Sequence, residues 1–141
     1  MRYRVVAVGR MRDAALRAVC DSYLQRLRRY TKVDEREVKA EARILEAVAE
    51  GSCLVALAEQ GDQCTSAQLA DWTARWELEG RDVTFALGGA DALPAPVLRG
   101  AERIWSLSRL TLPHELARVV LYEQLYRAYT IRRGEPYHRG P

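Results

Sequence analysis

Residues 83–89 read Val83-Thr84-Phe85-Ala86-Leu87-Gly88-Gly89, a short apolar run that stops abruptly at two glycines. A run of this length and composition predicts a strand buried on both faces, as in a parallel sheet. Residues 5–8 and 53–57 have the same character, and residues 33–39 and 103–107 are predicted as further strands, with 33–39 at an edge of the sheet.

Helical patterns lie between these strands. Thr65 and Gln68 have the spacing of a capping box, so a helix is expected to begin near Ser66, and Gly80 is placed to end it. Apolar spacing and punctuation predict the other helices over residues 16–30, 40–49, 95–100 and 113–132. Because strands and helices alternate, the sequence predicts an α/β fold with a mostly parallel sheet covered by helices.

Length and composition exclude a disordered chain, a collagen-like repeat and a multi-domain enzyme. The chain has 141 residues, of which 48% are hydrophobic and 29% charged, as expected of one globular domain over residues 1–141. No apolar run approaches the roughly 18 residues of a membrane span. The three cysteines and two histidines lack the spacing of a disulfide framework or a metal site, so we expect buried thiols, no metal and a cytoplasmic location.

Charge is distributed unevenly along the chain. Residues 1–39 carry 11 basic and 5 acidic side chains, residues 40–98 carry 3 and 10, and residues 99–141 carry 8 and 4. Two basic ends therefore flank an acidic middle. This pattern favours a polyanionic partner if the ends meet in space, and a solvated charged surface if they do not.

Two segments that follow predicted strands are candidate ligand sites, because ligands of open α/β sheets bind beyond the carboxyl ends of the strands. Gly88 and Gly89 would let a ligand approach the backbone, although glycines also form plain turns. The apolar loop from Leu107 to Pro113 is suited either to wrap an uncharged heterocycle or to pack in the core.

The C-terminal segment mixes aromatic and basic residues. Tyr122, Tyr126 and Tyr129 share a helical face and are expected to lie mostly in the core. The cations Arg127, Arg132 and Arg133, and the following Tyr137-His138-Arg139, have the composition of an RNA-binding surface, or of a frayed terminus.

Four blocks of sequence, at compatible spacing, resemble the RlmH family of SPOUT methyltransferases, and the resemblance covers nearly the whole chain. The blocks are Leu87-Gly88-Gly89, Trp105-Ser106-Leu107-Ser108-Arg109-Leu110-Thr111-Leu112-Pro113-His114, Glu123-Gln124-Leu125-Tyr126-Arg127-Ala128 and Pro136-Tyr137-His138-Arg139.

The resemblance implies a SPOUT-type α/β fold with a C-terminal trefoil knot, a homodimer and the cofactor S-adenosylmethionine. It implies methylation of N3 of a pseudouridine in large-subunit ribosomal RNA, within assembled ribosomes. On the matching positions, Leu57, Gly88, Gly89 and the loop residues Leu107, Ser108, Arg109, Leu110, Thr111 and Leu112 would bind the cofactor. The resemblance also implies that Tyr137, His138 and Arg139 lie near the target base, at the partner subunit's cofactor pocket.

The chemistry of methyl transfer suggests roles for the tail. The N3 imide must lose a proton, so we assign His138 as base or relay and Arg139 as the cation that stabilises negative charge, with Arg127 as a further candidate.

The chain departs from the family pattern at two points. Ala92 stands where relatives commonly have a third glycine, and the segment 39–43 lacks a Gly/Lys-rich insertion. The shorter segment leaves RNA contact to other cations, namely Arg26, Arg28, Arg29 and Lys32. Two alternatives follow: a non-catalytic RNA- or ribosome-binding protein of the same fold, or a methyltransferase of another RNA.

Overall fold

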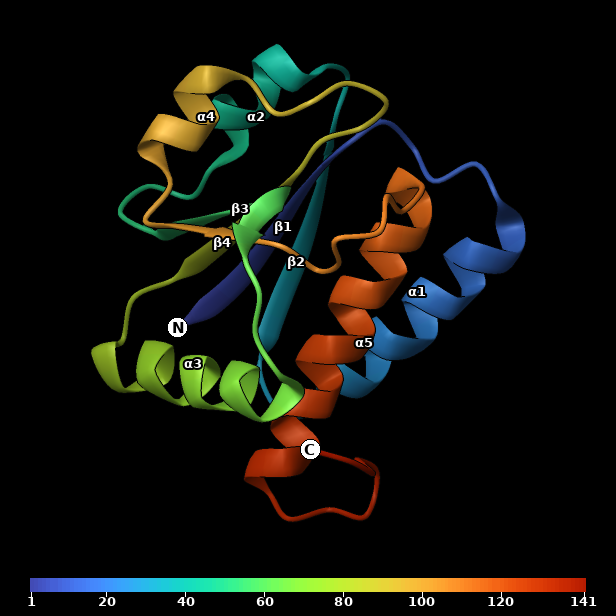
Figure 1. The fold of residues 1–141 in the computed structure, drawn as a ribbon, viewed down its shortest axis with the longest axis vertical. Helices are drawn as coiled ribbons and strands as arrows, with labels where there is room; N and C mark the ends of the chain where they lie inside the picture. The colour runs from blue at the N-terminus through green and yellow to red at the C-terminus, as the bar shows by residue number, and fades with distance from the viewer.

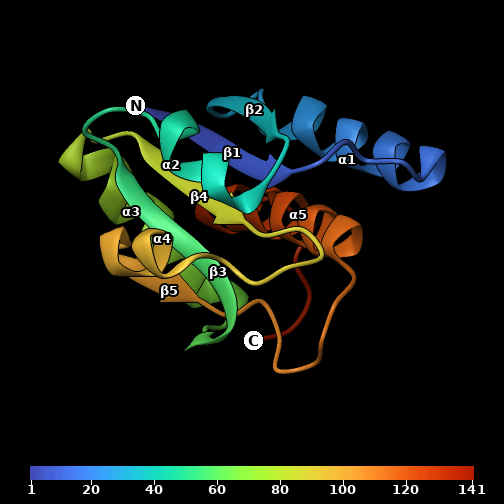
Figure 2. The ribbon, with the colours of Figure 1, turned by 90° about the horizontal axis from the view of Figure 1, so that it is seen from above.

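Five parallel strands form one sheet, in the order β2-β1-β4-β3-β5 (Figure 2). The computed structural model describes all residues from 1 to 141. The strands are β1 (Arg2–Val8), β2 (Lys32–Val38), β3 (Cys53–Asp62), β4 (Val83–Leu87) and β5 (Arg103–Trp105). The predicted α/β class is confirmed, and β2 lies at an edge of the sheet as expected.

Helices cover both faces of the sheet (Figure 1). They are α1 (Ala14–Leu27), a 3₁₀ turn (Glu41–Arg43), α2 (Ile44–Ala47), α3 (Ser66–Glu79), α4 (Ala95–Gly100) and α5 (His114–Arg132). The helices α1, α3 and α5 pack on one face, where α5 contacts both of its neighbours, while α2 and α4 lie on the opposite face.

The alternation of side chains along each strand divides the core into two clusters. In β4, Val83, Phe85 and Leu87 point toward the larger cluster beneath α1, α3 and α5. Ala86 points the other way, into a smaller cluster with Ile44 of α2 and Val97 of α4. The continuous apolar run of β4 thus reflects burial on both faces.

Local signals placed most helix boundaries correctly. The Thr65–Gln68 capping box is present, and Gly80 ends α3 in the left-handed conformation, with φ of 72°. The predicted helix over 95–100 is also confirmed. Tyr122 and Tyr129 are buried as expected, whereas Tyr126 is half-buried.

Several predicted extents were wrong. The strand expected over 5–8 begins at Arg2, and the helix expected over 16–30 spans Ala14–Leu27. The helix expected over residues 40–49 is only a 3₁₀ turn followed by α2, because Val48 is extended and Arg4 donates a hydrogen bond of 3.1 Å to the Ala47 carbonyl. The strand expected over 53–57 continues to Asp62. The last strand ends at Trp105 instead of residue 107, and the chain then turns, with the Ser106 hydroxyl donating to the carbonyl of Ser108.

Candidate functional site

A cavity of about 410 Å³ opens beside the C-terminal half of β3 and beyond the carboxyl end of β4. This volume is within the usual range of small-molecule sites, roughly 300–1,000 Å³. Ten of its seventeen lining residues are hydrophobic. The lining comprises Leu57, Ala58, Glu59, Gln60, Leu87, Gly88, Gly89, Asp91, Ala92, Leu93, Leu98, Leu107, Ser108, Leu110, Leu112, His114 and Ala117.

The glycine pair after β4 forms one wall of the cavity, and the wall depends on missing side chains. A Cβ on Gly88 would lie 2.8 Å from the carbonyl oxygen of Asp91, which is too close for any real side chain. A Cβ on Gly89 would lie 3.2 Å from the side chain of Val8 at the end of β1. The pair is therefore required for this close approach of the backbone, and φ is not positive at either residue.

The loop between β5 and α5 forms a second wall. The Ser108 hydroxyl accepts a hydrogen bond of 2.9 Å from the Leu110 amide, so the loop is folded on itself. This turn places Leu107, Ser108, Leu110 and Leu112 against the cavity.

Two residues of the predicted cofactor-binding loop do not line the cavity. The Arg109 guanidinium donates to the Glu59 carbonyl and borders a separate polar hollow that includes Arg103 and Asp71. Thr111 is exposed and is absent from the lining. Backbone folding alternates the direction of neighbouring side chains here, which the sequence did not reveal.

The three predicted catalytic residues lie at the C-terminal tail, where Glu123 organises the contacts. Its carboxylate accepts a hydrogen bond of 2.7 Å from Tyr137 and forms an ion pair of 2.8 Å with Arg127. Burial, followed by the hydrogen bond to Glu123, raises the pKa of Tyr137. Glu123 stands in one of the four family blocks but had no predicted role, although an acid four residues before an arginine on a helix is a recognisable signal.

His138 has both ring nitrogens occupied. Nδ1 lies 3.0 Å from Arg127, and Nε2 lies 3.0 Å from the carbonyl oxygen of Pro141. Because a guanidinium can only donate, Nδ1 is the acceptor and the proton is assigned to Nε2. Arg139 is exposed and forms no ion pair.

Within one chain, the tail and the cavity lie apart. His114, in the first turn of α5, lines the cavity, whereas His138 contacts Arg127. His114 and Arg127 are thirteen residues apart on α5, which corresponds to about 20 Å along the helix axis. In Figure 1 the loop that leads into α5 lies at one end of the helix, and the tail lies at the opposite end.

The six cations predicted to bind RNA gather around the C-terminal halves of α1 and α5. Arg132 pairs with Glu77 at 2.7 Å, and Arg133 lies over the Tyr30 ring. Arg26 lies over the rings of Tyr23 and Tyr126. Arg127 is paired as described, while Arg28 donates to the Val33 carbonyl and Arg29 is exposed.

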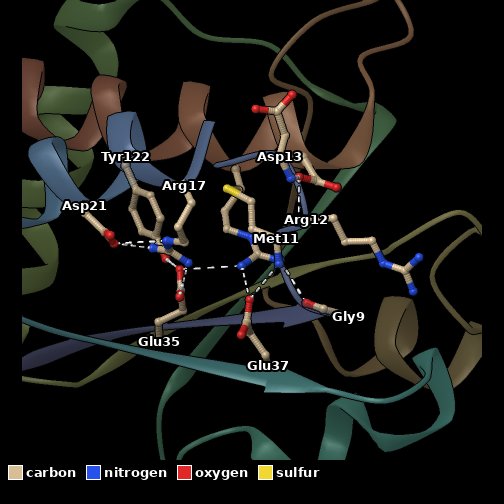
Figure 3. A network of polar contacts seen from close by, with 11 residues as sticks. Gly9, Met11, Arg12, Asp13, Arg17, Asp21, Glu35, Glu37 and Tyr122 are labelled. Carbon is tan, nitrogen blue, oxygen red and sulfur yellow. Dashed lines mark hydrogen bonds and ion pairs between the residues drawn. The ribbon is translucent and has the colours of Figure 1, made fainter. Parts of the chain in front are cut away.

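A buried ionic network at the other end of α5 was not predicted (Figure 3). Arg118, with its side chain only 2% exposed, binds Glu37 at 2.6 Å and the Gly9 carbonyl at 3.1 Å. Glu35 joins the network through Arg17 at 2.8 Å and through a hydrogen bond from Tyr122. Two acids at alternate positions of an edge strand were the available signal, since such spacing places both on one face.

The network controls the ionisation of Glu37. Burial by itself would raise the pKa of this carboxyl, but the hydrogen bonds and charge of Arg118 outweigh that effect, and the pKa is lowered. Glu37 is therefore held as a carboxylate beside the buried guanidinium.

A model of the family described as predicted SPOUT methyltransferase matches residues 1–138. The chain belongs to this family. It is therefore a methyltransferase that uses S-adenosylmethionine, as the resemblance of the sequence implied.

Curated relatives cover nearly the whole chain. A protein of Sorangium cellulosum is 46% identical over 97% of this chain and 99% of its own length. One of Polynucleobacter asymbioticus is 40% identical over 99% of both chains, and one of Anaeromyxobacter sp. strain Fw109-5 is 46% identical over 99% of this chain and all of its own. Each is named ribosomal RNA large subunit methyltransferase H.

Solved structures of low sequence identity share the fold. A probable methylase family protein from Haemophilus influenzae aligns over 98% of this chain and 70% of its own, with a TM-score of 0.63 and 8% identity. The SpoU methyltransferase AviRb from Streptomyces viridochromogenes, solved with S-adenosylmethionine, aligns over 94% of this chain and 58% of its own, with a TM-score of 0.51 and 13% identity.

The cavity of this SPOUT methyltransferase fits such a cofactor. The glycine wall presents backbone to the cavity, in a loop shape that a Cβ on Gly88 would disrupt at the Asp91 carbonyl, and the surrounding leucines suit a flat heterocycle. Glu59 and Asp91 add carboxylates to the lining, which suit the amino and hydroxyl groups of the same molecule.

No helix combines the length and the apolar composition that crossing a membrane requires. No group of three or more His, Cys, Asp or Glu side chains is arranged to hold a metal ion.

Proposed function

We propose that the protein methylates N3 of a pseudouridine in large-subunit ribosomal RNA, acting on assembled ribosomes in the cytoplasm. The observation that carries the proposal is the cavity wall at Gly88 and Gly89, in a chain 40–46% identical, over nearly its whole length, to relatives named as large-subunit rRNA methyltransferases.

The cofactor site in this proposal comprises Leu57, the glycine pair and the cavity-facing part of the 107–112 loop. The bound cofactor supplies an electrophilic methyl group on a sulfonium. The task of the chain is to hold the nucleophilic nitrogen in line with that methyl group, which accounts for much of the acceleration of bimolecular transfers. Leucine walls exclude water from the same space.

The tail is proposed to handle the proton and the charge. His138 Nδ1 accepts the N3 proton once it exchanges the Arg127 contact for the substrate. Arg139, which is unpaired, stabilises the negative charge that develops on the deprotonated base, and Tyr137 anchors the segment to α5 through Glu123.

We propose that the active protein is a homodimer in which the tail of one subunit completes the cavity of the other. The support is the separation of tail and cavity within one chain, together with apolar surface on the adjoining helices. Val19 of α1 and Leu116 of α5 are 40% and 37% exposed.

The aromatic and basic surface near the tail is proposed to contact ribosomal RNA. Its members are Arg26, Arg28, Arg29, Arg127, Arg132 and Arg133. The guanidinium groups pair with phosphates, and the half-buried tyrosines beside them offer stacking surfaces.

The test is methyl transfer from labelled S-adenosylmethionine to ribosomes that lack the modification, with naked ribosomal RNA as the parallel substrate. The modified fragment is mapped by mass spectrometry. We expect label at N3 of one pseudouridine, on ribosomes and not on naked RNA. His138→Ala should abolish transfer, while Leu78→Ala, at an exposed position of α3, should not alter it.

Other outcomes would contradict the proposal. Cofactor binding without label on ribosomes would indicate a methyltransferase of another RNA. Neither binding nor transfer would favour a ribosome-binding protein of the same fold.

A further inference from the structure

Three unpaired cations lie together where β1 and β2 end. Arg10 and Lys39 directly follow Gly9 and Val38, whose backbones are joined by a hydrogen bond of 2.8 Å. Arg12 is two residues further along the same loop. All three side chains belong to exposed residues and form no ion pair.

This group of three, which we call the basic rim, borders the cofactor cavity on two sides. On one side, Gly89 of the cavity wall packs against Val8, next to the start of the loop. On the other side, Glu115 binds the loop backbone, and its neighbour His114 lines the cavity. The rim is therefore separated from the cavity by one or two residues on each side.

Two carboxylates, those of Glu37 and Glu115, fix the backbone of this loop (Figure 3). Glu37 accepts from the Met11 amide at 3.2 Å, and Glu115 accepts from the amides of Arg12 and Asp13 at 3.0 Å each. Arg118 in turn holds Glu37 and the Gly9 carbonyl. The loop is thus preorganised by its backbone, which leaves its arginine side chains available for a partner.

Figure 3 shows the Arg12 side chain extending away from the network, while Arg17 points into it. The contrast separates two uses of arginine in this part of the chain. Arg17 forms ion pairs with Glu35 and Asp21, whereas Arg12 forms no ion pair with any of the three acids of β2.

The basic rim differs in position from the cations near the tail. Arg28 and Arg29 precede β2, which begins at Lys32, whereas Lys39 follows the end of this strand. Seven strand residues correspond to about 20 Å. The rim lies at the cavity end of the sheet, and the other group at the opposite end.

We propose that Arg10, Arg12 and Lys39 bind the phosphate backbone of the substrate RNA beside the target nucleotide. This inference rests on the proposed function and names the surface that holds the RNA at the cavity. Three free cations on a rigid loop match successive phosphates, and they supply sequence-independent affinity that positions the strand.

The test compares two triple variants of the full-length protein that remove the same charge. The first is Arg10→Gln, Arg12→Gln and Lys39→Gln; the control is Arg75→Gln, Arg81→Gln and Arg99→Gln, at exposed positions away from the rim, where only Arg81 forms an ion pair, with Glu102 at the surface. Binding to large ribosomal subunits and to ribosomal RNA transcripts is measured over a range of salt concentrations, with cofactor binding by calorimetry.

We expect the rim variant to bind RNA at least tenfold more weakly, and to lose about 3 from the slope of log K against log salt, one for each phosphate contact. The control variant should stay within twofold of the original protein. Cofactor affinity should be unchanged in both, because neither set lines the cavity.

The inference is overturned if the rim variant binds RNA as the control does, or if the original protein binds no RNA. Because binding is read without catalysis, a protein that binds RNA through the rim and transfers no methyl group would contradict the proposed function alone. A rim variant that still transfers methyl groups and binds RNA with the affinity of the original protein would contradict only the role of the rim.

Discussion

The glycines at the end of β4 are required for space, whereas Gly80 and Gly134 are in the left-handed conformation that glycine favours. At Gly88 the nearest atom is a backbone oxygen, which no side-chain rotation can move. Gly88→Ala should therefore displace the loop from Gly88 to Leu93 and weaken S-adenosylmethionine binding at least tenfold, measured by calorimetry.

Gly100→Ala is the matched control for this substitution. A Cβ there would meet only Leu54 Cδ2, at the ordinary contact distance of 3.8 Å, and the residue ends α4 away from the cavity lining. Its cofactor affinity should equal that of the original protein. If the original protein, Gly88→Ala and Gly100→Ala all have the same cofactor affinity, the glycine wall does not bind the cofactor.

The Arg118–Glu37 pair predicts a pH-dependent contribution to stability. Removing one partner of a buried pair is costly, and because Glu37 is 30% exposed we expect Glu37→Gln to lower the free energy of unfolding by about 2 kcal/mol at pH 7. The measurement is urea denaturation at a series of pH values.

The sign of the pH dependence follows from the lowered pKa of Glu37. A carboxyl whose folded pKa is depressed stabilises the fold above its unfolded pKa of about 4.3, and this stabilisation is lost as pH falls through the folded pKa. The difference in the free energy of unfolding between the original protein and Glu37→Gln should therefore become smaller in acid. Glu50→Gln, at an exposed carboxylate outside every ion pair, should show little difference at any pH.

Among the elements, α3 has the clearest boundary signals. The Thr65 hydroxyl accepts from the Gln68 amide at 3.0 Å, and the Gln68 side chain accepts from the Thr65 amide at 2.8 Å. Thr65→Ala should lower the free energy of unfolding by about 1 kcal/mol, since it leaves the Gln68 amide without its partner. The measurement is urea denaturation. Gln63→Ala, at an exposed residue just before the helix, should cost much less; equal losses would mean that the cap contributes nothing.

At the scale of the whole molecule, the separation of tail and cavity predicts a shared active site. His138→Ala removes the proposed base. Gly88→Arg places a long side chain in the proposed cofactor wall, where even a Cβ has no room, so each variant alone should be inactive. Co-expressed, the two should form mixed dimers with one complete site, and methyl transfer should return. Sedimentation should show a dimer throughout.

A mixture that stays inactive, although mixed dimers are isolated, would mean that each tail serves its own chain. The threading of the C-terminal segment as a knot stays a prediction.

The sequence determined most elements because their signals are local. Burial on both faces selects the apolar run of β4, and caps fix the ends of α3. The glycine pair and the leucine loop could each be predicted as a candidate ligand site because both follow strands of a parallel sheet, whose carboxyl ends meet at one edge. The predicted helix over 40–49 failed because a contact from β1 ended it early.

Only the tertiary structure decided which distant residues meet. Pairing β4 between β1 and β3 brings Gly89 against Val8, and packing α5 on the sheet brings Glu115 to Arg12 and Arg118 to Glu37. The direction of Arg109 and the distance from His138 to the cavity were decided in the same way. The physical reason is that periodicity reports which side of an element is buried, whereas the partner on that side depends on strand order and helix packing.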